Sequence, residues 1–130
     1  PEVAITLARL YREMGDKRAA IAYLDEAMIV QPEATSPYAL AAIFYRDSGD
    51  LDSALDVLQR GNDATEGGSA EIHFLLGHIY IDRGDLDSAV VHAERAYGLG
   101  YPLPGLASKL RRLGRPIELG GSVSDSRQKD

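Results

Sequence analysis

The sequence contains no cysteine and no tryptophan among its 130 residues. Without cysteine the chain can form neither a disulfide framework nor a thiolate metal site, so it suits the cytosol and the periplasm equally well. No apolar run approaches the ~20 residues that a membrane-spanning helix needs, and no signal-like segment is present. We therefore expect a soluble protein, cytoplasmic or periplasmic, without membrane insertion.

Basic residues are also scarce: 14 Lys and Arg stand against 20 Asp and Glu, a net charge of −6. An acidic balance disfavours phosphate-rich partners such as nucleic acid. The length is typical of one domain, able to bury roughly two thirds of its unfolded surface. The chain begins at Pro1 directly in a helical pattern, and we expect it to be a fragment or a processed product.

One hexapeptide, Gly-Asp-Leu-Asp-Ser-Ala, occurs twice, at residues 49–54 and 84–89, and a looser version occupies residues 15–20. The three leading glycines are spaced 34 and then 35 residues apart. Self-similarity at this period is typical of stacked repeats, each one supersecondary unit long.

Each unit is predicted to be two amphipathic helices around a Gly-Asp turn. In the first unit Ala4, Leu7, Ala8 and Tyr11 fall at i, i+3, i+4 and i+7, the stripe of one helix face. The glycine can adopt the left-handed conformation of a helix exit, and the aspartate can cap the next helix. Small residues recur where helix axes are expected to cross closely: Ala8, Ala42 and Gly77 in the first helices, and Ala20, Ala54 and Ala89 in the second helices.

These units resemble tetratricopeptide repeats. The family pattern of aromatic-x₂-Leu-Gly-x₂-Tyr, then Ala-x₃-Phe, then Pro is matched three times, in the first unit by Leu7-Ala8-x₂-Tyr11, Ala20-x₃-Leu24 and Pro32. Tryptophan is absent, and the second helices carry no phenylalanine in the family's slot. The resemblance implies an all-α fold, a right-handed α-α superhelix of antiparallel helix pairs, with repeats at 1–34, 35–69 and 70–102.

Three segments lie outside the strict repeat pattern. Residues 61–69 have the composition of a flexible loop, with an inter-repeat hinge as the alternative. After the turn that starts at Tyr101, leucines at 106, 110 and 113 predict a capping helix within 103–117, which the end of a repeat stack requires. Residues 118–130 are rich in Gly, Ser and charge, and we expect a disordered tail.

No arrangement of residues indicates catalysis, a metal or a cofactor. The three histidines have no ligand spacing, and His73 occupies a packing position, which favours a core histidine. Arg83-Gly84-Asp85 stands where the other units have Ser48-Gly49-Asp50 and Met14-Gly15-Asp16, so it is interpreted as a helix-connecting turn. The basic residues between Lys109 and Arg115 are interpreted as the solvated face of the cap. We predict a non-enzymatic protein with no cofactor and no metal.

In the tetratricopeptide family the first helices line a concave surface that usually binds peptides. The resemblance implies that residues off the packing stripe face this surface here: Ile5, Arg9, Arg12, Ala39, Ile43, Arg46, Phe74, His78, Ile81 and Asp82. Apolar anchors beside arginines favour a peptide or protein partner with apolar anchors and some acidic character. Replacing Phe74 and Arg46 by Ala is expected to weaken partner capture with little change in stability. The alternative is that an adjacent helix buries Phe74 and Ile81.

Other functions remain open at this point. The repeats could stack between chains into a homo-oligomeric scaffold, or serve as the accessory repeat segment of a larger enzyme or secretion assembly. Recognition of chaperone tails is disfavoured, because the family's carboxylate clamp of Lys and Asn is replaced here by Ile5, Arg9, Leu40, Glu71 and Leu75.

Overall fold

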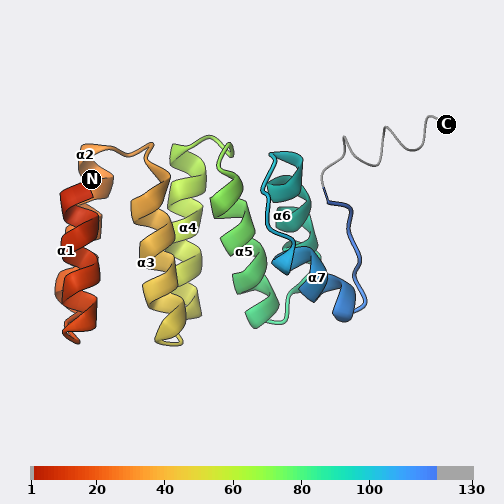
Figure 1. Ribbon diagram of the computed structural model, residues 1–130, viewed down its shortest axis with the longest axis horizontal. Coiled ribbons are helices and arrows are strands. Elements are labelled where there is room, and N and C mark those ends of the chain that lie inside the picture. Colours follow the sequence, from red (N-terminus) through yellow and green to blue (C-terminus); the bar gives the residue numbers. More distant parts are fainter. Residues whose placement is uncertain (1, 120–130) are drawn as a thin grey trace. The chain divides into compact units, whose positions relative to one another are not determined.

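A computed structural model describes residues 2–119 of the chain as helices joined by short turns (Figure 1). No strand occurs within this range, and the prediction of an all-α fold built from antiparallel helix pairs is confirmed. Pro1 and residues 120–130, which include most of the predicted tail, lie outside the described residues. The helices are α1 (Glu2–Glu13), α2 (Lys17–Val30), α3 (Thr35–Asp47), α4 (Leu51–Ala64), α5 (Ala70–Asp82), α6 (Leu86–Gly98) and α7 (Gly105–Arg112).

The repeated Gly-Asp turn has the same geometry each time. Gly15, Gly49 and Gly84 have φ values of 85°, 79° and 82°, a left-handed conformation that glycine adopts without strain. The aspartate that follows caps the next helix, as predicted; the side chain of Asp50, for example, accepts a hydrogen bond of 3.1 Å from the Ser53 amide. This bond and one from the Ser53 side chain hold the pKa of the Asp50 carboxyl below its usual range.

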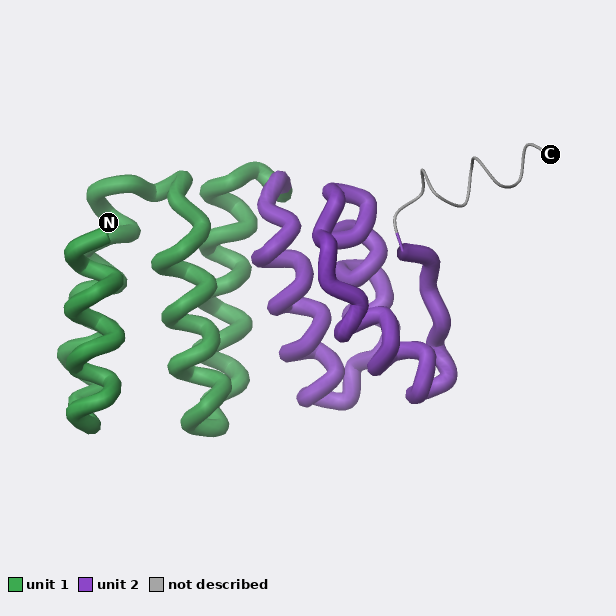
Figure 2. Tube along the Cα trace, in the orientation of Figure 1, with its two compact units in different colours: residues 1–67 green, residues 68–130 purple. Residues whose placement is uncertain are grey.

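The chain divides into two compact units, residues 1–67 and 68–130 (Figure 2). In the first unit α1 packs against α2, α3 packs against α4, and α2 packs against α3. In the second unit α5 packs against α6, and α7 contacts both of them. The small residues predicted at the helix crossings are all buried, which confirms their packing role: Ala8, Ala20, Ala42, Ala54, Gly77 and Ala89.

Two local expectations were wrong. Residues 61–64 belong to the last turn of α4 and not to a loop, and Gly61 is buried. Its composition is misleading because a glycine at this position allows close packing, as Ala27 and Ala96 do in the other units. The third leucine of the predicted capping helix, Leu113, follows the end of α7 and is 46% exposed, because the helix ends at Arg112.

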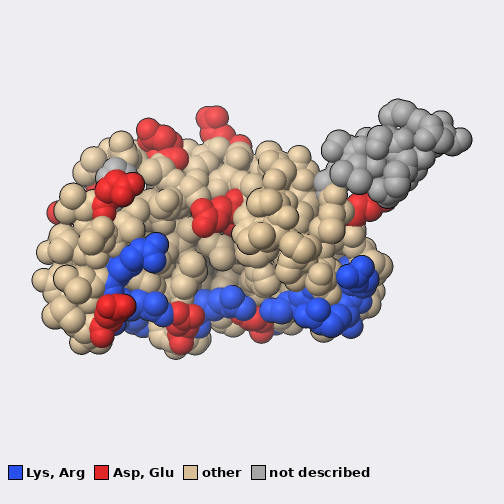
Figure 3. Space-filling view, in the orientation of Figure 1, with Lys and Arg blue, Asp and Glu red and all other residues tan. Residues whose placement is uncertain are grey.

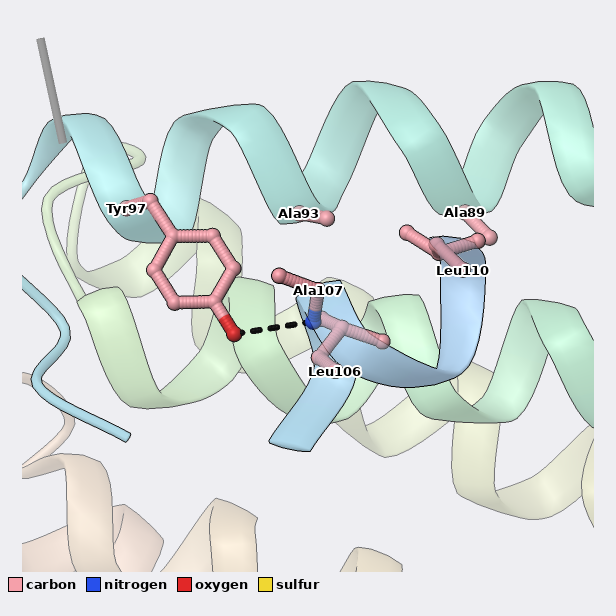
Figure 4. Packing of buried hydrophobic residues seen from close by; sticks show 6 residues of the cluster. All are labelled: Ala89, Ala93, Tyr97, Leu106, Ala107 and Leu110. Atoms are coloured by element: carbon pink, nitrogen blue, oxygen red, sulfur yellow. Dashed lines mark hydrogen bonds between the residues drawn. The ribbon is translucent and has the colours of Figure 1, made fainter. Parts of the chain in front are cut away.

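Helix α7 is held by a hydrogen-bonded tyrosine. Its N-cap residue, Pro104, makes no side-chain cap hydrogen bond. Instead the Tyr97 hydroxyl accepts a 3.0 Å hydrogen bond from the Ala107 amide (Figure 4). The same hydroxyl donates a 2.8 Å bond to the Leu103 carbonyl. The cluster around this tyrosine contains Ala89, Ala93, Leu106, Ala107 and Leu110, and α7 is thereby fixed to α6.

Candidate protein-interaction surface

In the first unit, the C-terminal ends of α1 and α3 are joined by Arg12. Its guanidinium forms an ion pair with the Asp47 carboxylate and lies 4.6 Å from the centroid of the Phe44 ring. Both side chains of the ion pair remain about half exposed. Because Arg12 and Asp47 come from the first helices of successive repeats, the pair brings predicted binding residues of α1 beside those of α3.

The other predicted residues of this unit differ in accessibility. Arg9 is exposed, and Ile5, Ile43 and Arg46 are half-buried. Ala39 is only 3% exposed, so its side chain contributes packing and offers almost no surface to a ligand. Figure 3 shows Lys and Arg side chains gathered over the C-terminal halves of α1 and α3, with acidic side chains between them. This surface therefore combines partly exposed aliphatic groups with guanidinium groups.

The first residue of α2, Lys17, adds a further positive charge near α3. Lys17 Nζ donates a 3.0 Å hydrogen bond to Ser48 Oγ and lies 5.9 Å from the centroid of the Tyr45 ring. Burial, followed by the charges of Asp25 and Asp50, raises the pKa of the Tyr45 phenol above its ordinary value. The phenol therefore stays protonated to a higher pH than an ordinary tyrosine.

In the second unit, Phe74 is engaged by other aromatic rings. It stacks on Tyr101 with a centroid distance of 4.1 Å and meets His78 edge-on at 4.6 Å. Phe74 and Ile81 are half-buried, and both pack against the cluster that contains Leu106 and Leu110 of α7.

Phe74 and Ile81 had two interpretations from the sequence: accessible binding residues, or side chains buried by an adjacent helix. Both side chains contact the α7 cluster, and each keeps part of its surface accessible. Replacing Phe74 by Ala would remove a stacked aromatic pair as well as accessible surface. Contrary to the sequence-based expectation, this change should therefore also lower the stability of the fold.

The last predicted residue of this unit, Asp82, is exposed at the end of α5.

A histidine pair connects α5 and α6. The Nδ1 atoms of His73 and His92 are 3.0 Å apart, a hydrogen-bond distance, and the two rings stack with centroids 5.2 Å apart. Tyr80 stacks on His92 at 5.6 Å. Burial, with smaller effects from the neighbouring His73 and Arg95, lowers the pKa of His92 to about 4.

The packing prediction for His73 is confirmed, since it is 1% exposed. Its partner was missed, although an antiparallel α5–α6 pair brings positions 73 and 92 to similar distances from the Gly84 turn. The neighbouring stack of Tyr80 on His92 does recur, because Tyr11 and Tyr23 occupy the same repeat positions in the first unit and stack with centroids 5.5 Å apart. This spacing was a signal for the aromatic contact of His92 with Tyr80, whereas His73 corresponds to Ala4 in the first unit and has no such signal.

Two further observations concern metal binding and membrane insertion. Within residues 2–119 no group of three or more His, Asp or Glu side chains is arranged to hold a metal ion. None of the helices in that range has the length and apolar character to cross a membrane.

The sequence analysis missed two aromatic residues that contact predicted binding residues: Phe44, which lies beneath Arg12, and Tyr101, which stacks on Phe74. Tyr101 occupies the repeat position at which the first unit has its closing proline, Pro32. The family pattern therefore gave no reason to expect an aromatic contact there.

Comparison with known proteins agrees with the geometry. Two family models described as tetratricopeptide repeat match residues 5–69 and 70–99. Among solved structures, one titled "MamA MSR-1 C2" aligns with a TM-score of 0.62 at 20% sequence identity, covering 88% of this chain and 67% of that one. A likeness at this identity concerns the fold. No curated protein matches the sequence significantly.

Proposed function

The chain belongs to the tetratricopeptide repeat family, and from this premise we propose that it is a non-enzymatic module that binds a peptide segment on the face formed by α1 and α3. Repeats of this family generally mediate protein–protein interactions and are typically not catalytic. The finer proposal concerns which face is used and which peptide chemistry it selects.

The observation that carries the proposal is the Arg12 contact across the two helices. The guanidinium lies over the Phe44 ring and beside Asp47, while its side chain remains 42% exposed. An arginine held in this way is oriented in advance, so a peptide carboxylate can bind it at a smaller entropic cost. Arg9 and Arg46 add positive charge on the same two helices.

The apolar part of the site supports a peptide with hydrophobic anchors. Ile5 and Ile43 each keep part of their surface accessible, and aliphatic groups between charged ones suit alternating apolar and acidic side chains. We therefore propose a partner segment that carries Asp or Glu beside Leu, Ile or Phe. In the second unit, taken by itself, Phe74, His78, Ile81 and Asp82 are proposed as binding residues, as far as their contacts with Tyr101 and α7 allow.

The experiment is selection of peptides from a display library on the purified chain, followed by affinity measurement with the selected peptides. We expect an enriched pattern of acidic and apolar residues. Arg9→Glu with Arg46→Glu should weaken binding by at least about tenfold, which corresponds to about 1.4 kcal/mol. Arg18→Glu is the control, because Arg18 is exposed on the second helix α2 and its charge change equals that of either single variant, Arg9→Glu or Arg46→Glu. Equal losses in the control and the double variant would contradict the choice of face.

A further inference from the structure

Helix α1 has a second apolar stripe beside its packing stripe, and the two stripes share Leu7. Val3, Leu7, Leu10 and Met14 stand at i, i+4, i+7 and i+11, one continuous stripe on a helix. Three of these side chains are well exposed: Val3 at 73%, Leu10 at 51% and Met14 at 66%. Scattered exposed apolar residues are ordinary, but a contiguous stripe marks an interaction surface.

The other repeats show what normally happens at these positions. The register that aligns the Gly-Asp turns places Pro37 and Ile72 at the position of Val3, and Phe44 and Ile79 at the position of Leu10. All four are buried, with Phe44 at 2% and Ile79 at 1% exposed. Helix α3, which carries Phe44, packs against the preceding helix α2. This side of a first helix is therefore suited to be covered by another helical element.

The stripe continues into a groove with an acidic rim. A cavity of about 380 Å³ between α1 and α2 is lined by Glu2, Val3, Ala4, Leu7, Tyr23, Glu26, Ala27 and Val30. Its two charged lining residues, Glu2 and Glu26, are both acidic, and Val30 is 71% exposed. We call this surface the α1–α2 groove. Two such grooves facing each other would bring like charges together, which disfavours a symmetric pairing through this surface.

The complementary chemistry lies around α7 of the same chain. Leu103 and Leu113, on either side of the helix, are 58% and 46% exposed. Arg111 and Arg112 are exposed in its last turn, and Figure 3 shows basic side chains gathered over α7. We call Leu103, Arg111, Arg112 and Leu113 the α7 surface. The α7 surface combines exposed leucines with positive charge, whereas the α1–α2 groove combines exposed valines with negative charge.

We propose that the α1–α2 groove binds the α7 surface of a second copy of this chain. The contact is heterologous, because each copy presents one surface and leaves the other available, so it generates head-to-tail oligomers. Leucine side chains of one copy cover Val3 and Val30 of the next, and Arg111 and Arg112 meet Glu2 and Glu26. This association is independent of the peptide-binding face proposed above and does not rest on it.

The test is the solution mass of the 130-residue chain as a function of its concentration, measured by sedimentation velocity and light scattering. We expect the average mass to rise above the 14.1 kDa of one copy. We also expect association to weaken when the salt concentration increases from about 0.05 M to about 0.5 M, since the Debye length shortens. A chain that stays monomeric at every attainable concentration overturns the proposal, even if a helix from another protein binds the groove.

Two variants, each blocking one surface, establish the head-to-tail arrangement. Val3→Glu with Val30→Glu blocks the groove, and Arg111→Glu with Arg112→Glu blocks the α7 surface. Each variant alone is expected to be monomeric, and their mixture is expected to form a 1:1 heterodimer of twice the monomer mass. Self-association of the α7 variant alone would reveal groove-to-groove pairing and overturn the proposal.

Controls separate surface effects from folding effects. Val91→Glu changes a valine that is 43% exposed on α6 and belongs to neither surface, so it should associate like the wild type. Circular dichroism checks that every variant keeps its helices. If reversal of Arg111 and Arg112 loosens α7, Arg111→Gln with Arg112→Gln removes the charge with less disturbance, and it should still weaken association. Normal association of this well-folded Gln variant contradicts the proposed charge pairing.

Discussion

Leu106 of α7 lies directly on Gly77 of α5: a Cβ atom placed on Gly77 would be 2.7 Å from Leu106 Cδ2 and 3.4 Å from Cδ1. The first two repeats have Ala8 and Ala42 at this position. The missing methyl group in the third repeat leaves space that the leucine fills, and both residues are buried. The glycine therefore allows α7 to approach α5 closely.

This contact predicts that the effect of Gly77→Ala depends on residue 106. In the wild-type background the added methyl group meets Leu106, and overpacking of about 1–3 kcal/mol should exceed the helix-propensity gain of about 1 kcal/mol. In a Leu106→Ala background the obstacle is absent, so the same change should stabilise the fold. Urea denaturation of the four proteins measures both effects. Gly98→Ala is the control, because nothing lies within 4 Å of its added methyl group, and equal effects of Gly77→Ala in both backgrounds contradict the contact.

The Tyr97 hydroxyl gives a second prediction. Tyr97→Phe removes the hydrogen bonds to the Leu103 carbonyl and the Ala107 amide while keeping the buried ring. A loss of about 1–3 kcal/mol in the free energy of unfolding is expected, because the buried Ala107 amide loses its partner. Hydrogen exchange should show the largest increase in α7. Tyr101→Phe, which keeps the ring stacked on Phe74, should change stability much less, and similar losses in both variants would argue against the capping role.

The histidine pair predicts a pH dependence of stability. The pKa of His92 is lowered from 6.5 to about 4 in the folded chain, so the unfolded chain binds the proton more readily in this range. The stabilisation is therefore complete above pH 6.5, falls as the pH decreases toward about 4, and shows no further loss from this group below that. His92→Gln is expected to flatten the curve between these values.

Chemical denaturation at a series of pH values between about 4 and 7.5 measures this dependence. The window extends from the folded-state pKa of His92 to just above its unfolded value. Val91→Gln, a change at an exposed neighbour on the same helix, should keep the slope of the wild type. Parallel curves for His92→Gln and the wild type would exclude His92 as the responsible group.

The ion pair between Arg12 and Asp47 predicts a change in binding without a large change in stability. Asp47→Asn removes the internal carboxylate that competes with an acidic peptide for Arg12. A partly exposed pair contributes about 0–1 kcal/mol to stability, so the melting temperature should change little while the affinity for acidic peptides increases. Fluorescence anisotropy with a selected peptide measures the affinity. Asp25→Asn on α2 is the matched control, and a weakened affinity of the Asp47 variant would show that the ion pair is required for binding.

Much of the fold could be predicted because the repeat supplies its own register. Gly15, Gly49 and Gly84 share one left-handed turn, and the aspartates that follow share one capping hydrogen bond. These are local interactions between neighbours in sequence, so a pattern of residue types is sufficient to indicate them. Where local composition conflicted with packing, as at Gly61, the prediction was wrong, because a glycine in a turn and a glycine at a close helix crossing look alike in sequence.

The candidate sites could be predicted only in part. The spacing of residues placed Arg12 and Arg46 on first helices, but it did not indicate that Arg12 lies on Phe44 and beside Asp47. Nor did it distinguish Ala39, which is buried, from Ile43, which keeps some exposure. These differences depend on how far neighbouring helices cover each position, and that is a property of packing between distant segments.

The sequence by itself determined the helical repeat, its turns and the small residues at its crossings, since each follows from interactions within about one helical turn or from a period repeated three times. Only the tertiary structure decided which apolar residues are covered. Leu10 and Phe44 occupy the same place in the repeat register, yet Leu10 is 51% exposed and Phe44 is 2% exposed. The physical reason is that burial depends on the presence of a neighbouring helix, and identical local patterns have different surroundings along the chain.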